Sequence, residues 1–181
     1  MSYTIRHATP EDKSEWLRMR QGLWPDAPLQ YLDYDLDDLL ADPDAAIFVA
    51  SDADGRLIAF IEAGLRDYGE GCETSPVGYI EAWYVDPHVR GQKLGRDLVY
   101  TAEQWAREKG CTEMASDTWL DNETSIAAHL SLDGMFPPRR ANPDPALWDV
   151  ARSAQLVTCQ TVETDLGPVE VRYLQPHERW D

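Results

Sequence analysis

The stretch from Tyr79 to Gly95, YIEAWYVDPHVRGQKLG, constrains the fold of this chain more than any other part of the sequence. Residues 77–85 are rich in Val, Tyr, Ile and Trp, which favour a pleated, largely buried surface around one carboxylate, Glu81. Pro87 then ends the ladder, because proline has no N–H to donate. The sequence therefore predicts a buried strand over 77–85.

The residues after Pro87 predict a tight loop that leads directly into a helix. Arg90, Gly91 and Gly95 make this loop compact and permissive, and apolar residues recur at helical spacing over 94–109. A helix N-terminus directs unpaired backbone N–H groups and the positive end of its dipole toward one point. Such a junction suits a phosphate or pyrophosphate group, although an ordinary strand-to-helix turn has the same local sequence.

The pattern V-x-P-x-x-R-G-x-x-x-G-x-x-L over 85–98 resembles the acetyl-coenzyme A (acetyl-CoA) motif of the GCN5-related N-acetyltransferases (GNAT). Over roughly residues 3–129 the chain looks like the aminoglycoside 6'-N-acetyltransferases. The stretches that carry this second likeness are Leu23-Trp24-Pro25, Gly71-Cys72, Ser75-Pro76-Val77, Glu81, Lys109-Gly110-Cys111, 113–118, Asn122 and His129.

This resemblance implies an α/β (α+β) chain with the GNAT fold. In that fold a mixed, mostly antiparallel sheet is flanked by helices and is splayed at the acetyl-CoA site, here between strands 77–85 and 112–118. We expect a single acetyltransferase domain over 1–181. Its segment 137–181 is atypical, because the likeness weakens sharply after residue 136 and two proline-containing stretches follow.

The resemblance also implies which residues bind acetyl-CoA. The loop can hold the pyrophosphate through backbone N–H groups, with added charge from Arg90, Lys93 and Arg96. The family usually has Gly where this chain has Lys93, whose side chain either crowds the phosphates or points outward. The full set of expected cofactor residues is Trp83, Tyr84, Val85, Arg90, Gly91, Gln92, Lys93, Leu94, Gly95, Arg96, Asn122 and His129.

Two of these cofactor residues could instead serve the fold alone. Asn122 resembles the residue that contacts the pantetheine arm, yet capping of the next helix would be enough to account for it. His129 occupies the place where many acetyltransferases have a Tyr that protonates the leaving thiolate. A lone His in an apolar helix is more often structural.

Glu81 and Asp117 are the expected catalytic residues. A carboxylate in an apolar strand is costly to bury unless it is paired or faces a cleft. An ion pair within the sheet could therefore account for Glu81, and helix capping could account for Asp117. By resemblance, both positions match acids that line the 6'-acetyltransferase site. There a carboxylate binds the substrate ammonium and helps to remove one proton.

The expected substrate-binding residues are aromatic or acidic, as a polycationic substrate requires. Aromatic rings offer sugar faces apolar contact and attract cations. A core role is as plausible for Trp24, whereas Tyr68 lies in the polar loop 66–76, where binding is favoured. The full set is Trp24, Asp26, Tyr68, Glu70, Glu73, Glu81 and Asp117.

The remaining sequence predicts conventional elements. Apolar patterns and turn residues predict a short strand over 3–7, a helix that begins at Thr9-Pro10 and breaks at Trp24-Pro25, and a hairpin of 46–51 with 57–65. A second amphipathic segment covers 32–40. A strand over 112–118 follows Gly110, which is a natural helix end, and a helix follows over 122–132. Residues 156–164 and 169–174 are typical of a closing hairpin.

Composition limits the possible partners. Sixteen Lys and Arg against 33 Asp and Glu give a net charge of −17, which repels nucleic acid and attracts polycations. Three widely spaced cysteines without a C-x-x-C pair do not indicate a zinc site. The sequence shows no apolar run long enough to span a membrane and no apolar signal core at its start. We therefore expect a cytoplasmic protein with no bound metal and no membrane partner, and a homodimer by analogy with related enzymes.

Overall fold

In the computed structural model, the described residues are 2–69, 72–119, 122–132, 155–161 and 172–174. They belong to two compact units, of which the first comprises 1–65 and 80–105 and the second comprises 66–79 and 106–181. The chain passes between these units within regular elements, because β4 (Val77–Val85) and α4 (Leu94–Glu108) each contain residues of both.

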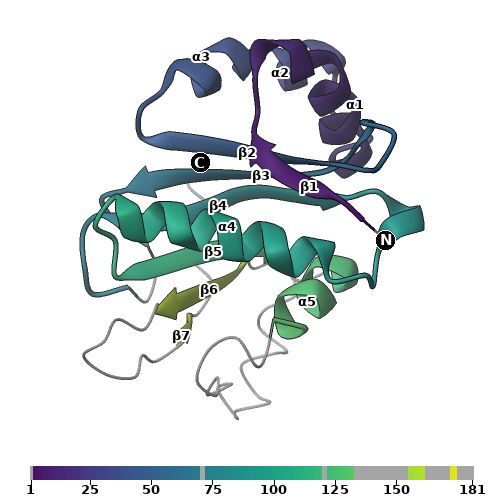
Figure 1. The fold of residues 1–181 in the computed structure, drawn as a ribbon. Helices are drawn as coiled ribbons and strands as arrows, with labels where there is room; N and C mark the ends of the chain where they lie inside the picture. The colour runs from purple at the N-terminus through teal and green to yellow at the C-terminus, as the bar shows by residue number, and fades with distance from the viewer. Residues whose placement is uncertain (1, 70–71, 120–121, 133–154, 162–171, 175–181) are drawn as a thin grey trace. The chain divides into compact units, whose positions relative to one another are not determined.

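The sheet of the first unit is antiparallel over its first strands. β1 (Thr4–His7) pairs with β2 (Ala45–Ser51), and β2 pairs with β3 (Leu57–Arg66). β4 is the next strand of this sheet, beside β3 (Figure 1). The strand expected over 77–85 is confirmed at both ends, because β-forming residues run without a break as far as the segment before Pro87.

The turn between β2 and β3 shows why the predicted hairpin forms. Asp52 Oδ1 accepts hydrogen bonds from the backbone N–H groups of Asp54 and Arg56, both at 3.0 Å. Gly55 has φ of 82°, in the left-handed region that glycine adopts at little cost. A short polar sequence thus reverses the chain and sets the register of the two strands.

The first helix begins where the capping residues predict, but its first turn is tighter than an α-helix. η1 (Pro10–Asp12) is a 3-10 turn, and α1 (Lys13–Leu23) follows it. Asp12 Oδ2 accepts hydrogen bonds from the Thr9 N–H at 2.8 Å and from the Thr9 hydroxyl at 3.1 Å. These bonds satisfy donors that an uncapped start would leave unpaired.

The single amphipathic segment expected over 32–40 is wrong in detail, because the structure has two short helices there. α2 spans Leu29–Asp33 and α3 spans Leu36–Ala41. The Leu32 carbonyl, near the end of α2, accepts a hydrogen bond from Arg20 Nη1 at 2.9 Å. One apolar pattern in the sequence thus corresponds to two helices, which are separated by Tyr34 and Asp35.

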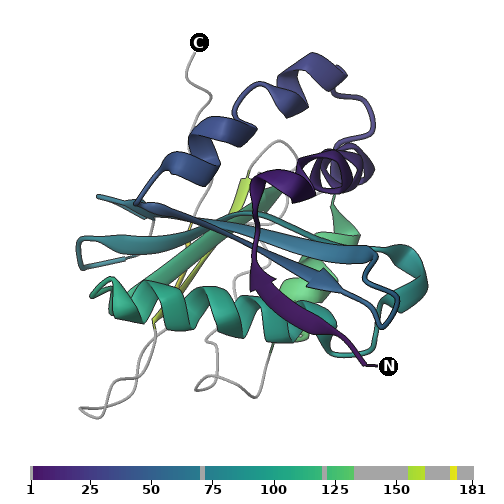
Figure 2. The same ribbon diagram turned by 45° about the horizontal axis from the view of Figure 1, so that its top comes forward.

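Helices cover both faces of the β2–β3 pair. Figure 2 shows α1, α2 and α3 on one face and α4 on the other. On the first of these faces a core of buried side chains joins the helices to the sheet. Its members are Trp16, Met19, Leu36, Ile47, Val49, Leu57, Phe60, Ala82 and Tyr84.

The second unit contains three further strands in antiparallel pairs. β5 (Glu113–Trp119) pairs with β6 (Gln155–Thr161), and β6 pairs with β7 (Arg172–Leu174). The predicted closing strands 156–164 and 169–174 are thus confirmed where the structure describes them. Residues 162–171, where we expected their turn, lie outside the described residues.

Two helix ends of the second unit follow their sequence signals. Gly110 has φ of 87° and is the second residue after α4, which ends at Glu108. The backbone N–H of Cys111 donates to the Ala106 carbonyl at 3.0 Å. This is the left-handed helix ending for which glycine is favoured. α5 (Glu123–Leu130) begins after Asn122, whose Oδ1 accepts from the Ser125 N–H at 3.0 Å.

The arrangement is a mixed α/β fold with a sheet flanked by helices, which confirms the predicted fold class. Its expected splay, and the assignment of 1–181 to one domain with an atypical segment 137–181, stay predictions. Among the described residues, no helix has the length and apolar character needed to cross a membrane.

Candidate functional site

The strand–loop–helix junction predicted from the sequence is present in the first unit. β4 ends at Val85, η2 (Pro87–Val89) makes one 3-10 turn, and α4 begins at Leu94. The Arg90 Nε donates to the Val85 carbonyl at 2.9 Å, so part of this guanidinium holds the loop to the end of its own strand. Arg90 is exposed and can also present charge to a ligand.

The loop before α4 has an unusual backbone. Gly91 has φ of 76° and Lys93 has φ of 69°, and both residues are exposed. The Lys93 carbonyl accepts from the Asp97 N–H at 3.0 Å, which closes the first helical turn and leaves the N–H groups of 94–96 without partners inside the helix. These donors and the positive helix end make an anion-binding geometry.

Gly95 is required by a close approach between α4 and β4. A Cβ placed on Gly95 would lie 2.7 Å from Cζ2 of Trp83, closer than real Cβ contacts allow. The first turn of the helix therefore packs directly on the indole. Trp83 therefore packs against the start of α4, in addition to the cofactor contact that the sequence predicts for it.

Asp86 organises the start of the loop, although the sequence pattern did not single it out. This buried carboxylate accepts from the Tyr84 hydroxyl at 3.1 Å and from Arg18 Nη1 at 3.2 Å. Burial raises the pKa of Tyr84, and the negative charge of Asp86 raises it further. The network ties α1 to the end of β4. Arg18 is 68 residues from Asp86, so local sequence patterns could not reveal this contact.

Glu81 is exposed, so the energetic argument for a buried ion pair does not apply. Its Oε1 lies 3.7 Å from the position that a Cβ on Gly64 of β3 would take. Gly64 and Phe60 share one face of β3, because they are four residues apart. Phe60 packs with Ala82 and Tyr84 in the core, whereas the exposed Glu81 carboxylate lies beside Gly64.

Trp24 and Asp26 lie immediately after α1, in the first unit. Trp24 is 38% exposed. Its backbone N–H donates to the Arg20 carbonyl at 2.9 Å, which is the last hydrogen bond of α1. The Arg20 guanidinium lies 5.9 Å from the centre of the Trp24 ring. The indole is therefore held on one side and accessible on the other, which is compatible with a packing role and with substrate binding. Asp26 is exposed.

The second unit contains the other predicted polar residues. Asp117 is half-buried near the end of β5, opposite Val157 of β6. Tyr68 is 61% exposed in the loop after β3, and Glu73 is also exposed. Glu70 lies outside the described residues.

Glu113 fixes the loop that contains Glu73, a role that the sequence did not suggest. Its buried Oε2 accepts from the Glu73 N–H at 2.8 Å, the Thr74 N–H at 2.6 Å and the Thr74 hydroxyl at 2.6 Å. A carboxylate at the first position of a strand gave no signal of this role. Three converging donors show that it anchors the chain just before β4.

His129 has the environment of a structural residue. It is buried, its Nδ1 lies 2.8 Å from the Ser125 carbonyl oxygen, and its Nε2 lies 3.1 Å from Ser116 Oγ. The ring thereby links α5 to β5. Asn122 likewise has the capping bond that its sequence position allows. Both remain predicted cofactor residues with an evident structural role.

The candidate residues are thus divided between the two units. Trp24, Asp26, Glu81 and the loop 90–96 belong to the first unit. The second unit has Tyr68, Glu73, Asp117, Asn122 and His129. Within the first unit, the loop and Glu81 both belong to the β4–α4 segment.

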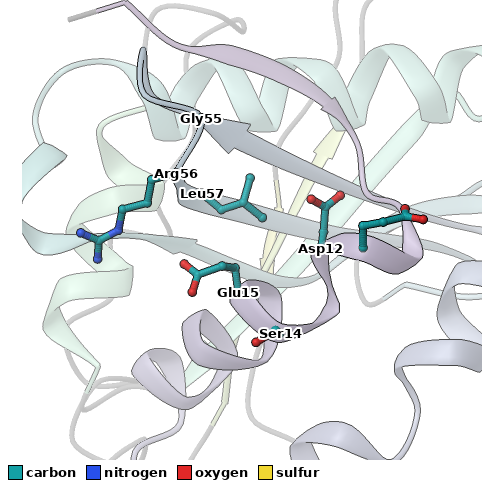
Figure 3. A pocket seen from close by; sticks show the side chains of 7 residues that line it. Asp12, Ser14, Glu15, Gly55, Arg56 and Leu57 are labelled. Carbon is teal, nitrogen blue, oxygen red and sulfur yellow. The ribbon is translucent and has the colours of Figure 1, made fainter.

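A pocket of about 450 Å³ lies elsewhere in the first unit, between η1–α1 and the β2–β3 turn (Figure 3). It is lined by Glu11, Asp12, Ser14, Glu15, Gly55, Arg56 and Leu57, none of which the sequence predicted as a site residue. Its Asp12 pairs with Arg6 at 2.6 Å, and its Glu15 pairs with Arg18 at 3.0 Å. Two acids of this pocket are thus already paired with arginines.

Comparison with known proteins agrees with the predicted family. Residues 16–134 match the acetyltransferase (GNAT) family. An aminoglycoside N(6')-acetyltransferase type 1 of Stenotrophomonas maltophilia is 46% identical over 129 residues, which are 70% of this chain and 82% of the relative. A protein of the same description from Klebsiella aerogenes is 41% identical over 130 residues, covering 70% of this chain and 86% of the relative.

Solved structures lead to the same group. AAC(6')-Iy in complex with the bisubstrate analogue CoA-S-monomethyl-acetylneamine superposes with a TM-score of 0.69 at 32% identity, covering 80% of this chain and 98% of that chain. The aminoglycoside 6'-N-acetyltransferase AAC(6')-Ih from Acinetobacter baumannii has a TM-score of 0.69 at 32% identity, covering 79% of this chain and 97% of that chain.

Proposed function

The chain belongs to the acetyltransferase (GNAT) family, and on this premise we propose that it transfers the acetyl group of acetyl-CoA to the 6'-amine of aminoglycoside antibiotics, which would confer resistance. The observation that carries this proposal is the likeness to aminoglycoside N(6')-acetyltransferases, at 46% identity over 82% of the Stenotrophomonas relative. The loop 90–96 supports the proposal, because it leads with positive φ at Gly91 and Lys93 into the N-terminus of α4.

Acetyl-CoA is the acetyl donor, and the geometry of the loop fits it. The space around Gly91 is open, because a Cβ at this position would meet no atom within 4 Å. Lys93 is exposed. The backbone N–H groups of 94–96 can bind the pyrophosphate, with charge from Arg90, Lys93 and Arg96. When bound, the cofactor supplies an activated thioester carbonyl.

The substrate residues hold a polycation. Glu81 and Asp117 provide carboxylates for protonated amines, and Asp26 and Glu73 add exposed negative charge. The rings of Trp24 and Tyr68 provide faces for sugars and cations. The net charge of −17 favours the approach of such a substrate at low salt.

Glu81 and Asp117 divide the proton chemistry. The amine must lose a proton before or while it attacks the thioester carbonyl, because an ammonium has no lone pair. We assign this proton to Asp117, which lies near a strand end and is half-buried, and we assign substrate orientation to Glu81. The ammonium gives one proton to the carboxylate, directly or through water, and the free amine then forms the C–N bond with the thioester carbonyl. As the C–S bond breaks, the second proton of the nitrogen passes to the thiolate, so that CoA leaves as the thiol.

One thiol-release assay tests the class of substrate. Acetyl-CoA is supplied with kanamycin-type and gentamicin-type aminoglycosides, with a 6'-hydroxyl aminoglycoside and with spermidine. We expect thiol release with the 6'-amino compounds alone. Thiol release with spermidine at a kcat/KM equal to that for the 6'-amino compounds would instead indicate a polyamine acetyltransferase. Binding of acetyl-CoA without thiol release from any compound would indicate a non-catalytic binding module.

Two further properties of the protein are part of this proposal. Acetyl-CoA is a cytoplasmic metabolite, which supports action in the cytoplasm. A homodimer is expected from the family, and light scattering after size-exclusion chromatography would give its mass. A monomer at micromolar concentration would contradict the second expectation without affecting the chemistry.

A further inference from the structure

Arg20 forms a buried ionic junction that the proposed chemistry does not use. The residue is 5% exposed although its side chain is charged. Its Nε donates to Glu62 Oε1 at 2.7 Å and its Nη2 donates to Glu62 Oε2 at 2.8 Å, so the guanidinium and the carboxylate of β3 form a bidentate pair. The Trp16 indole N–H also donates to Glu62 Oε1, at 2.8 Å.

The other side of the same guanidinium contacts the segment that follows α1. Nη1 donates to the Leu32 carbonyl at 2.9 Å and to Asp35 Oδ1 at 2.6 Å. The guanidinium carbon lies 5.9 Å from the centre of the Trp24 ring. One cation therefore connects the sheet to the beginning and to the end of the segment 24–35.

This segment presents exposed residues that need such an anchor. Its exposed large side chains, Trp24, Leu29, Tyr31 and Tyr34, contribute little to the core. α2 has only five residues, and a helix of one turn is marginal unless other contacts fix it. Polar bonds from the buried guanidinium therefore add to the burial of Leu32 in holding this segment.

We propose that Arg20 and Asp35 are positioning residues that set the place of the Trp24 ring and of the segment 24–35, and thereby the affinity for the aminoglycoside. The inference rests on the proposed function, in which Trp24 binds substrate. Glu62 holds the buried end of Arg20, whereas Asp35, whose side chain is 39% exposed, can be changed without opening the core.

The decisive variants are Asp35→Asn and Asp35→Ala, with Asp38→Asn as the matched control. Asp38 is exposed on α3, so the control removes the same charge from the same acidic segment without touching Arg20. We expect the Asp35 variants to raise the aminoglycoside KM by about 3- to 10-fold. The acetyl-CoA KM and kcat should stay within about two-fold, as should every constant of the control.

A second readout does not depend on turnover. Amide hydrogen exchange of the ligand-free protein should become faster over 24–35 in both Asp35 variants, and it should be unchanged over β3 and in Asp38→Asn. If the parent protein acetylates no aminoglycoside, the proposed function fails while this measurement still tests the anchor. Equal KM increases in the Asp35 and Asp38 variants, or unchanged exchange over 24–35, would overturn the proposal.

Discussion

Lys93 is the residue at which backbone conformation and side-chain identity disagree most clearly. Its φ of 69° lies in the left-handed region, which costs an L-residue about 1–2 kcal/mol relative to the right-handed helix. The same conformation directs the loop into the start of α4. The position therefore needs the conformation rather than the ammonium group.

We predict that Lys93→Gly leaves the acetyl-CoA KM within a few-fold and stabilises the protein by up to about 1 kcal/mol. Glycine removes the strain, and its greater freedom in the unfolded chain offsets part of this gain. Thermal unfolding and steady-state kinetics measure the two effects. Lys93→Ala, which removes the charge but keeps the strain, is the control. A large gain in activity would show that Lys93 obstructs the cofactor.

Asp12, just before α1, makes the stability of the folded protein depend on pH in a defined way. Its hydrogen bonds with Arg6, at 2.6 Å and 2.8 Å, lower the pKa of this carboxyl from the ordinary 3.8 to about 2. A lowered pKa means that the folded state prefers the charged form. The stabilisation is therefore complete above pH 3.8 and is lost as pH falls toward 2.

Asp12→Asn should remove this part of the pH dependence. We expect the melting temperature of the variant to fall at pH 7, and the difference from the parent to shrink between about pH 4 and pH 2. The exposed Asp54→Asn in the β2–β3 turn serves as the control. A difference that is constant down to pH 2 would show that the carboxylate charge is unimportant.

At the scale of elements, the sequence predicted those strands and helices whose signals are local. Strand 77–85 is bounded by uninterrupted β-forming residues and Pro87, and Gly110 marks the end of α4. Where partners are distant in sequence, prediction failed. Arg20 bonds to Leu32 beside the break between α2 and α3, and Glu113 accepts from Thr74 in the loop before β4. Neither contact can be read from neighbouring residues.

The candidate site was predictable to a similar extent. The family motif gave the loop 90–96, and the structure shows the backbone geometry that makes the motif useful. The same motif gave no indication of Asp86 and Arg18, which tie that loop to α1. Sequence motifs identify groups that touch ligands, whereas the residues that position those groups depend on tertiary contacts.

The closing strands make a prediction about truncation. β6 pairs with β5 along seven residues, from Glu113 with Thr161 to Trp119 with Gln155. A chain that ends at Pro137 would leave the edge of β5 without this partner, and an exposed edge promotes aggregation. We expect insoluble protein, or aggregates in size-exclusion chromatography. A soluble and active truncated chain would show that the tail is an appendage.

At the scale of the whole molecule, the proposed mechanism assigns separate roles to two carboxylates, Glu81 and Asp117. Glu81 lies in the first unit and Asp117 in the second. We predict that Asp117→Asn lowers kcat by about 10²- to 10⁴-fold, the usual contribution of a general base, while the fold survives. Glu81→Gln should lose less kcat and more aminoglycoside affinity, because we assign it to orientation.

The pH dependence of both amide variants provides the check on this assignment. If each keeps a near-parental kcat/KM over the whole pH range, neither carboxylate takes part in the chemistry. The amine would then lose its proton in solution before it binds. Circular dichroism of each variant separates this outcome from loss of the fold.

The most direct test of the central claim compares two aminoglycosides that differ only in a 6'-amine and a 6'-hydroxyl group. Thiol release and the mass of the product are measured for both compounds with the same enzyme preparation. We predict rapid release and a single added acetyl group for the 6'-amine, and neither for the 6'-hydroxyl compound. Equal acetylation of both would place the reaction at another position and contradict the proposed function.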